Sequence, residues 1–398
     1  MAKQPAEGTA ALPPALWALM FGNFVIGTGV MIVPGTLNDI SQSLLVPVPV
    51  AGQLISAAAL VMCLGAPFLA TIIGRWDRRQ MLTLTMVWFG LWHFLGAFMP
   101  NFYGLLSTRM LGVVASALFT PQAAACIALL TVPSQRGRAI TLVFLGWSIA
   151  SVAGMPLGAW IGGTLGWRSA FATVGLLSLI SAMWVWRALP DGVRPPLFSA
   201  GLWPSILRSK ALMLCVAVTA LASAGQFVLF AYIAPYLKSR FEVSALELSL
   251  VFAWYGTFGF LGNLLVSNHI DRLGPARSSM LAMGAIALSL TLWPLGVNLI
   301  ATCLVLVPWG LGCFAANSSQ QARLSALAPS LVSGSIALNT SAIYAGQAVG
   351  AASGGWLIAH QAMSSLHWAG LGFMTLALGT SWLALRTAQV KPAQTHIA

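Results

Sequence analysis

Arg109 is the residue of this sequence best placed to do chemistry in an apolar environment. It lies between Leu105-Leu106 and Met110-Leu111, about two helical turns from the predicted loop at 100–103. Ionisable residues inside such segments usually face the interior of a helix bundle and act there, which favours a binding role. The alternative is that the guanidinium extends along its stem to the nearby end of the segment.

The other ionisable groups do not form a catalytic cluster. Asp39 is the one acidic residue of the first predicted loop, and it either caps the next helix or lies near the mouth of a cavity. The sequence places no Asp or Glu deep inside a predicted helix, which disfavours a proton relay through an embedded carboxylate. His93 is deep but isolated, so a packed or lipid-interface position is the favoured interpretation. An enzyme would need clustered His, Asp or Glu, and we predict neither catalytic residues nor a metal site.

Neutral polar side chains within apolar segments are the candidates for lining a cavity. Amides in lipid must find hydrogen-bond partners, so they normally point into the protein. Some will bond across helices and others will contact a solute. The leading candidates are Asn23, Gln226, Tyr232, Asn317, Asn339 and Gln347.

The elements that carry these residues are predicted to be transmembrane helices. Only 7% of the 398 residues are charged, against roughly a quarter in soluble domains, and 278–322 and 324–385 contain no Asp, Glu, Lys or Arg. A helix needs about 20 apolar residues to cross a bilayer, and the runs are too long and continuous for a β-barrel. We therefore predict an all-α membrane protein. Its twelve segments are 13–37, 48–73, 81–99, 103–131, 139–164, 169–188, 211–236, 246–268, 279–296, 299–322, 334–359 and 366–388.

The net charge of +12 is explained by topology rather than by nucleic acid. If the N-terminus is cytoplasmic, the inner loops and tails hold fifteen Lys and Arg and the outer loops hold three. This positive-inside bias predicts that both termini are cytoplasmic and that the basic residues face anionic lipid. The five Cys fall within apolar segments without metal or redox spacing, so no cofactor is predicted.

The chain is predicted to consist of two similar halves. The polar, Pro-rich stretch 189–210 reads as a cytoplasmic linker between six-helix bundles at 1–188 and 211–398. Asp77 and Asp271 lie in loops separated by 194 residues, and two glycine series recur at a separation of 192. These separations indicate an internal duplication, as in transporters built from parallel repeats. The glycine series are Gly154, Gly158, Gly162 and Gly346, Gly350, Gly354.

Glycine at every fourth position lines one helix face and allows a second backbone to approach. Ordinary tight packing would explain either series alone. Their recurrence, with a predicted kink at Pro156, favours a moving seam where smooth helix faces rock or slide.

Several motifs together resemble the major facilitator superfamily over the whole chain, and more narrowly its twelve-helix drug:proton antiporter branch, which includes sugar and purine-nucleoside efflux proteins. They are specific for fold and transport but not for substrate. They are Gly154-Met155-Pro156-Leu157-Gly158 with Gly166-Trp167-Arg168 and Phe171, Arg109-Met110-Leu111-Gly112, Asp271-Arg272-Leu273-Gly274, Tyr232-Ile233-Ala234-Pro235, and Asn339-Thr340-Ser341 through Gly346-Gln347.

The resemblance implies roles for particular residues. It associates Arg109 with proton coupling or substrate contact, and it places helices 1, 4, 7 and 10 around a central cavity. It also implies a cytoplasmic latch, for which the candidates are Asp77, Arg78, Arg79, Asp271 and Arg272. The first-half motif departs from the family pattern, because Gly74 occupies the expected Asp position and Asp77 directly precedes Arg78-Arg79. The alternative is that these arginines only set the topology.

We therefore expect a bacterial inner-membrane secondary transporter, acting as a monomer, that exports a small neutral or amphipathic compound in exchange for protons by alternating access. The nearest alternative is a proton-coupled uptake symporter of the same fold. A sensor would usually carry an added soluble domain, and no segment is long enough to be one. No P-loop sequence is present, which disfavours ATP as the energy source.

Overall fold

The computed structural model describes residues 12–72, 76–132, 135–194, 203–328 and 331–389. Within these ranges every regular element is a helix. The first half contains α1 (Ala15–Ser43), α2 (Val48–Ala51), α3 (Gln53–Ile72), α4 (Arg78–Ala97), α5 (Phe102–Leu130), α6 (Arg136–Ile149), the π-helical turn η3 (Ala150–Gly154), α7 (Met155–Leu165) and α8 (Trp167–Ala188).

The second half follows the short helix α9 (Trp203–Arg208), which lies within the predicted linker. It contains α10 (Lys210–Phe230), α11 (Ile233–Phe241), α12 (Ala245–Leu273), α13 (Pro275–Leu292), η5 (Trp293–Leu295), α14 (Leu299–Leu327), α15 (Val332–Ala359), η7 (Met363–Ser365) and α16 (Leu366–Gln389).

The long helices match the predicted segments one for one. Among the described residues, ten helices are long and apolar enough to cross a membrane. Adding α4 and α15 to these ten gives twelve long helical segments, in agreement with the sequence. The fold is therefore that of an all-α membrane protein.

Short polar signals set several helix ends, and one is repeated between the halves. Asn101 accepts a hydrogen bond from the Gly104 amide at 2.8 Å and begins α5, and Asn298 does the same for Ala301 at the start of α14. A side-chain cap satisfies a backbone donor that the helix cannot satisfy itself. The two capped helices are the fourth long segment of each half.

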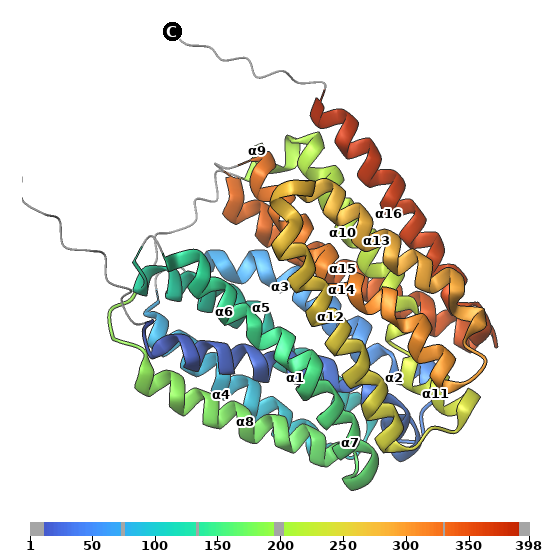
Figure 1. Ribbon diagram of the computed structural model, residues 1–398. Coiled ribbons are helices and arrows are strands. Elements are labelled where there is room, and N and C mark those ends of the chain that lie inside the picture. The colour runs from blue at the N-terminus through green and yellow to red at the C-terminus, as the bar shows by residue number, and fades with distance from the viewer. Residues whose placement is uncertain (1–11, 73–75, 133–134, 195–202, 329–330, 390–398) are drawn as a thin grey trace, which may run out of the picture.

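The two halves form separate bundles that meet at one end of the molecule (Figure 1). In the first half, α1 packs against α6 and α8, and α4 packs against α5 and α8. In the second half, α10 packs against α15 and α16, and α13 packs against α14. Contacts between the halves are made by α7 and η3 with α12, by α3 with α15 and by α1 with α11. We call the end where α8 ends and α10 begins the linker end, and the opposite end the Asp39 end.

The glycine ladders pack helices within each half, and their role in a moving seam stays a prediction. A methyl group at Gly154 would overlap Thr28 of α1, and those at Gly158 and Gly162 would meet Ile32 and Thr36 of the same helix. The ladder of α15 lies against α10 in the same way. There, Gly346, Gly350 and Gly354 face the carbonyl oxygens of Ala220, Ala224 and Val228.

Contacts of α7 with the other half use different positions. The carbonyl oxygen of Pro156 accepts a hydrogen bond from Ser249 Oγ at 2.9 Å, and Gly163 lies against Ala245. Period-four glycines specify a close helix partner, but the sequence does not say which half supplies it. Pro156 alone among the predicted seam residues contacts the opposite half through these interactions.

Candidate functional site

A cavity of about 1450 Å³ lies between the two halves. The first half contributes α1, α3, α5 and α6 with single residues of α4, η3 and α7, and the second contributes α10, α12, α14 and α15 with one residue of α13. The lining runs from Arg109 and Phe230, in the middle of the bundle, to Ala128, Ser267 and Ser325 near the linker end. A solute in this space would contact both halves at once.

The Asp39 end is closed by contacts between the halves. Lys238 Nζ lies 2.8 Å from Asp39 Oδ1, and each side chain is 21% exposed. Deeper in the molecule, Gly256 of α12 lies against the backbone of Ser151 in η3. The described lining extends to the linker end, so a solute would enter or leave this conformation there.

Arg109 reaches across from α5 to the middle of α1. Its Nη1 donates to the carbonyl oxygen of Gly29 at 2.7 Å, and its Nη2 donates to that of Val30 at 3.2 Å. Val30 would ordinarily accept from the amide four residues later, but that residue is Pro34, which has no N–H. Arg109 therefore satisfies a backbone carbonyl that a proline leaves free inside the membrane, where unpaired polar groups are costly.

His93 of α4 completes this cluster. Its Nδ1 lies 2.8 Å from the carbonyl oxygen of Phe89, an acceptor, so Nδ1 carries the proton and Nε2 presents a lone pair. Nε2 lies 3.4 Å from Arg109 Nη1, and the ring packs between Phe89 and Phe171. The sequence interpretation of His93 as a packed residue is therefore incomplete, because the ring is 3% exposed and also contacts Arg109.

A signal for this contact was present in the sequence. His93 and Arg109 lie four and seven residues from the turn that joins α4 to α5, on opposite arms of a helical hairpin. Helix rise therefore places them at similar depth.

The cavity lining is basic. Among the described residues that line it, the charged ones are Arg78 and Arg109, and none is Asp, Glu or Lys. Arg109 is 4% exposed and lies in the middle of the protein, whereas Arg78 lies at the start of α4 near the linker end. The lining therefore has a positive potential with no acidic residue to offset it.

Three of the six predicted cavity residues line the cavity: Gln226, Asn317 and Gln347. The other three do not, because they bond within the bundles. Asn23 donates to the Val143 carbonyl at 3.0 Å, Tyr232 donates to the Ala351 carbonyl at 2.8 Å, and Asn339 accepts from Thr219 at 2.6 Å. Thr219 itself lines the cavity, as does Thr120, which donates to Asn23.

Asp39 is not among the residues that line the cavity, and no side-chain hydrogen bond caps the next helix, α2. Its partner Lys238 lies 199 residues away in the chain. The structure therefore places Asp39 at the closure between the halves, and its coupling or substrate role stays a prediction.

Two first-half residues of the predicted latch, Asp77 and Arg79, contact the end of α8 and the residues that follow it. Asp77 caps α4 by accepting from the Arg79 and Gln80 amides, and its other oxygen accepts from the Gly192 amide at 2.6 Å. Arg79 pairs with Asp191 at 2.6 Å and lies over the Trp186 ring. These contacts tie the start of α4 to the end of α8.

The remaining latch residues are Arg78, Asp271 and Arg272, of which Arg78 also contacts the segment after α8, since its amide donates to the Val193 carbonyl at 3.0 Å. Arg78 lines the cavity, while Asp271 and Arg272 are exposed near the end of α12 and form no ion pair within the described residues. Gly74, where the family motif usually has Asp, lies outside the described residues. Among the described residues, Asp77, Arg79, Asp271 and Arg272 form no ion pair between the halves, and the cytoplasmic latch stays a prediction.

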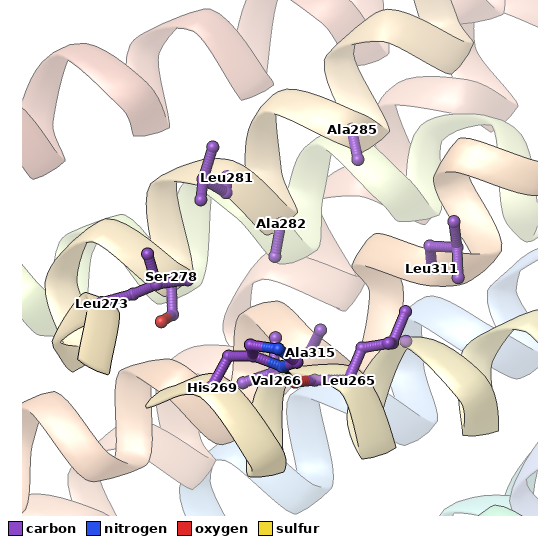
Figure 2. A pocket seen from close by; sticks show the side chains of 11 residues that line it. Leu265, Val266, His269, Leu273, Ser278, Leu281, Ala282, Ala285, Leu311 and Ala315 are labelled. Carbon is purple, nitrogen blue, oxygen red and sulfur yellow. Dashed lines mark hydrogen bonds between the residues drawn. The ribbon is translucent and has the colours of Figure 1, made fainter. Parts of the chain in front are cut away.

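A second hollow of about 240 Å³ lies between α12, α13 and α14 (Figure 2). It is lined by Leu, Ala and Val side chains with His269 and Ser278, and His269 Nδ1 bonds the Leu265 carbonyl at 2.8 Å. All of its lining comes from the second half, and none of the predicted site residues lies in it. It is therefore separate from the cavity between the halves.

Two helical bundles around a cavity that is closed at one end define an integral membrane transporter. The Major Facilitator Superfamily profile matches residues 19–351, and the chain belongs to that family. The family resemblance read from the sequence motifs is thus confirmed, as is the prediction that the protein is not an enzyme.

Relatives and solved structures agree with this assignment. The inner membrane transport protein YdhP of Escherichia coli K12 is 28% identical over 366 residues, covering 90% of each chain. A probable sugar efflux transporter of Mannheimia succiniciproducens is 28% identical over 363 residues, covering 91% of this chain and 90% of that protein. The crystal structure of a D-xylose-proton symporter superposes with a TM-score of 0.76 at 16% identity, covering 96% of this chain and 99% of that one.

Proposed function

We propose that the protein is a proton-coupled exporter of a small neutral or amphipathic compound, of the drug, sugar or nucleoside class, that works by alternating access. The observation that carries this proposal is the cavity that both halves line and that the Asp39–Lys238 pair closes at one end. Rocking of the halves about this cavity would open the Asp39 end and close the linker end. The efflux direction draws on the fifth-helix motif and on the efflux transporter among the relatives.

The proposed orientation places the linker end and both termini in the cytoplasm of a bacterial cell. The excess of Lys and Arg at that end supports this orientation, and twelve crossings return the chain to the side where it began. The inner membrane location draws on the name of the Escherichia coli relative. In this orientation the structure is the inward-open conformation, ready to take up a compound from the cytoplasm.

Proton coupling would involve Arg109 and His93. The contact between Nη1 and Nε2 requires neutral His93, because the protonated ring has no lone pair to accept the bond. A proton reaching His93 would place two cations in contact and release Arg109 from that bond. The basic chain would act as a monomer surrounded by lipid, with no nucleic acid partner.

Cross-linking tests alternating access directly. In a background with the native cysteines replaced, Asp39→Cys with Lys238→Cys are joined by a short bifunctional reagent, which holds the Asp39 end closed. Transport in everted vesicles is expected to fall at least tenfold after cross-linking and to return on reduction. The matched control is Arg79→Cys with Asp191→Cys, a pair within the first half whose cross-link should leave transport unchanged. Full transport by the cross-linked Asp39–Lys238 pair would contradict the proposal.

The second candidate is a proton-coupled uptake symporter, since the fold is shared with the D-xylose-proton symporter. The two functions differ in the direction of net movement. Right-side-out and everted vesicles with an imposed proton gradient separate them, because an exporter concentrates its compound only in everted vesicles. The compounds to screen are sugars, nucleosides and neutral antibiotics, first by ligand-induced thermal stabilisation of the purified protein.

A further inference from the structure

Two N–H groups of the Arg109 guanidinium have no hydrogen-bond acceptor among the residues that the structure describes. A guanidinium carries five N–H groups. Nη1 donates to Gly29 and faces His93, and Nη2 donates once to Val30. The second Nη2 hydrogen and the Nε hydrogen remain, and Nε is buried with no partner. Two neighbouring nitrogens of one planar group therefore keep unused donors, in a residue that lines the cavity.

This arrangement suits a carboxylate better than it suits a neutral group. Arginine donors are spaced to hold the two oxygens of a carboxylate in parallel, and such charge-assisted bonds are stronger than neutral ones. No Asp or Glu lies among the described lining residues to compensate the buried charge. A cation held away from water without a counter-ion is costly, so an anionic ligand would relieve a penalty already present in the empty site.

The second half offers an aromatic surface to the same cavity. Phe227, Phe230 and Tyr255 line it, with ring centroids 5.5 Å apart for Phe227–Phe230 and 5.1 Å for Phe230–Tyr255. Trp309 lies behind them, fully buried, with its ring centroid 6.0 Å from that of Tyr255. Rings fixed by their neighbours present a flat apolar face at little entropic cost, and such faces bind aromatic or alicyclic bodies.

We propose that the transported compound is an amphipathic organic anion. Its carboxylate binds the free Nε and Nη2 donors of Arg109, and its aromatic or alicyclic body packs on Phe227, Phe230 and Tyr255. The inference rests on the proposed transport function and narrows its substrate class. The carboxylate would be held by the first half and the body by the second. One such molecule would therefore contact both of the halves that rock against each other.

Binding of matched carboxylate and amide probes to the purified protein tests the inference. The probes are 2-naphthoate and 2-naphthamide, which share a ring system and differ in charge, and the measurement is isothermal titration in detergent. The wild-type protein is expected to bind the carboxylate about ten- to a hundredfold more tightly than the amide, as for hydrogen bonds to a charged group. Equal affinities, or no detectable binding of the carboxylate, would overturn the inference.

Substitutions of Arg109 test whether this residue causes the preference for the carboxylate probe. Arg109→Gln is expected to bring the affinities for the carboxylate and the amide within about twofold of each other. Arg109→Lys keeps the charge but loses the planar fork, so its ratio of the two affinities is expected to lie between those of the wild type and Arg109→Gln. Arg240→Gln is the control, since Arg240 lies outside the cavity beside Phe241 and its loss should leave the preference intact. Thermal unfolding of each variant confirms that it folds. A carboxylate preference that survives Arg109→Gln in a folded protein also overturns the inference.

Failure of the inference and failure of the proposed function give different results. Binding is measured without a membrane or a proton gradient, so it does not depend on transport. Transport of neutral compounds by a protein that shows no carboxylate preference would support the proposed exporter function and contradict the inference of an anionic substrate. Tight, Arg109-dependent binding with no transport in either vesicle orientation would contradict the proposed exporter function and support the anion-binding site.

Discussion

Arg109 donates a hydrogen bond to the carbonyl oxygen of Val30. Pro34 cannot donate to this oxygen, because proline has no backbone N–H. A proline in α1 and an arginine in α5 therefore act as one unit, although 75 residues separate them in the chain. Gly29 contributes to this unit in two ways, since its carbonyl also binds Arg109 and a methyl group at its Cα would meet the Phe89 ring.

Loss of the acceptor on His93 is expected to destabilise the protein and slow transport. His93→Phe keeps the ring packing against Phe89 and Phe171 but leaves an Arg109 N–H buried without a partner, which costs about 1–3 kcal/mol. His93→Gln keeps an acceptor oxygen and should lose less than half as much. Thermal unfolding and transport rates measured on both variants check this. Equal stability of the two variants would show that the contact with Arg109 contributes nothing.

Reversing the charge of Lys238 is expected to open the Asp39 end. Lys238→Asp would set two carboxylates together in place of a partly exposed ion pair, whose own contribution is about 0.2–1 kcal/mol. Repulsion should shift the population toward the outward-open conformation, seen as faster labelling of a cysteine introduced at Ser249, which is half-buried against Pro156 of the first half. The double variant Asp39→Lys with Lys238→Asp should restore slow labelling. Arg240→Asp, on the same helix, is the control and should change labelling little.

Substitution in the second glycine ladder is expected to loosen packing inside the second half. Gly350→Ala would drive a methyl group into the backbone of Ala224, at a cost of about 1–3 kcal/mol. Gly379→Ala is the matched control, because no atom lies within 4 Å of its added methyl group and alanine favours a helix. Midpoints of thermal unfolding should fall for the first variant and hold or rise for the second. A seam between moving halves would instead alter transport while leaving the unfolding midpoint unchanged.

Removal of the Asp77 side chain is expected to affect stability more than conformational balance. Asp77→Ala removes the cap of α4 and the acceptor for the Gly192 amide, and cap loss alone costs about 1 kcal/mol. Labelling of the cysteine at Ser249 should match that of the parent protein, since Asp77 makes these contacts within the first half. A latch across the halves would predict a clear change in that labelling when Asp77 is replaced.

Composition and periodicity were sufficient to predict the helices and the two-half architecture. Long charge-free runs force backbone groups to bond within each segment, so lipid-embedded helices follow from local sequence alone. Arg109 could also be singled out, because a charge within an apolar run is informative wherever the run packs. The glycine series lie at close helix contacts, and Gln226, Asn317 and Gln347 are among the residues that line the cavity.

Only the tertiary structure decided which partner each of these side chains meets. Asn23, Tyr232 and Asn339 turn toward neighbouring helices, Asp39 pairs with Lys238, and His93 meets Arg109. The sequence of one helix sets its length and its polar positions. Its rotation and its neighbours are set by packing against helices that lie far away in the chain, and those contacts leave no local signal.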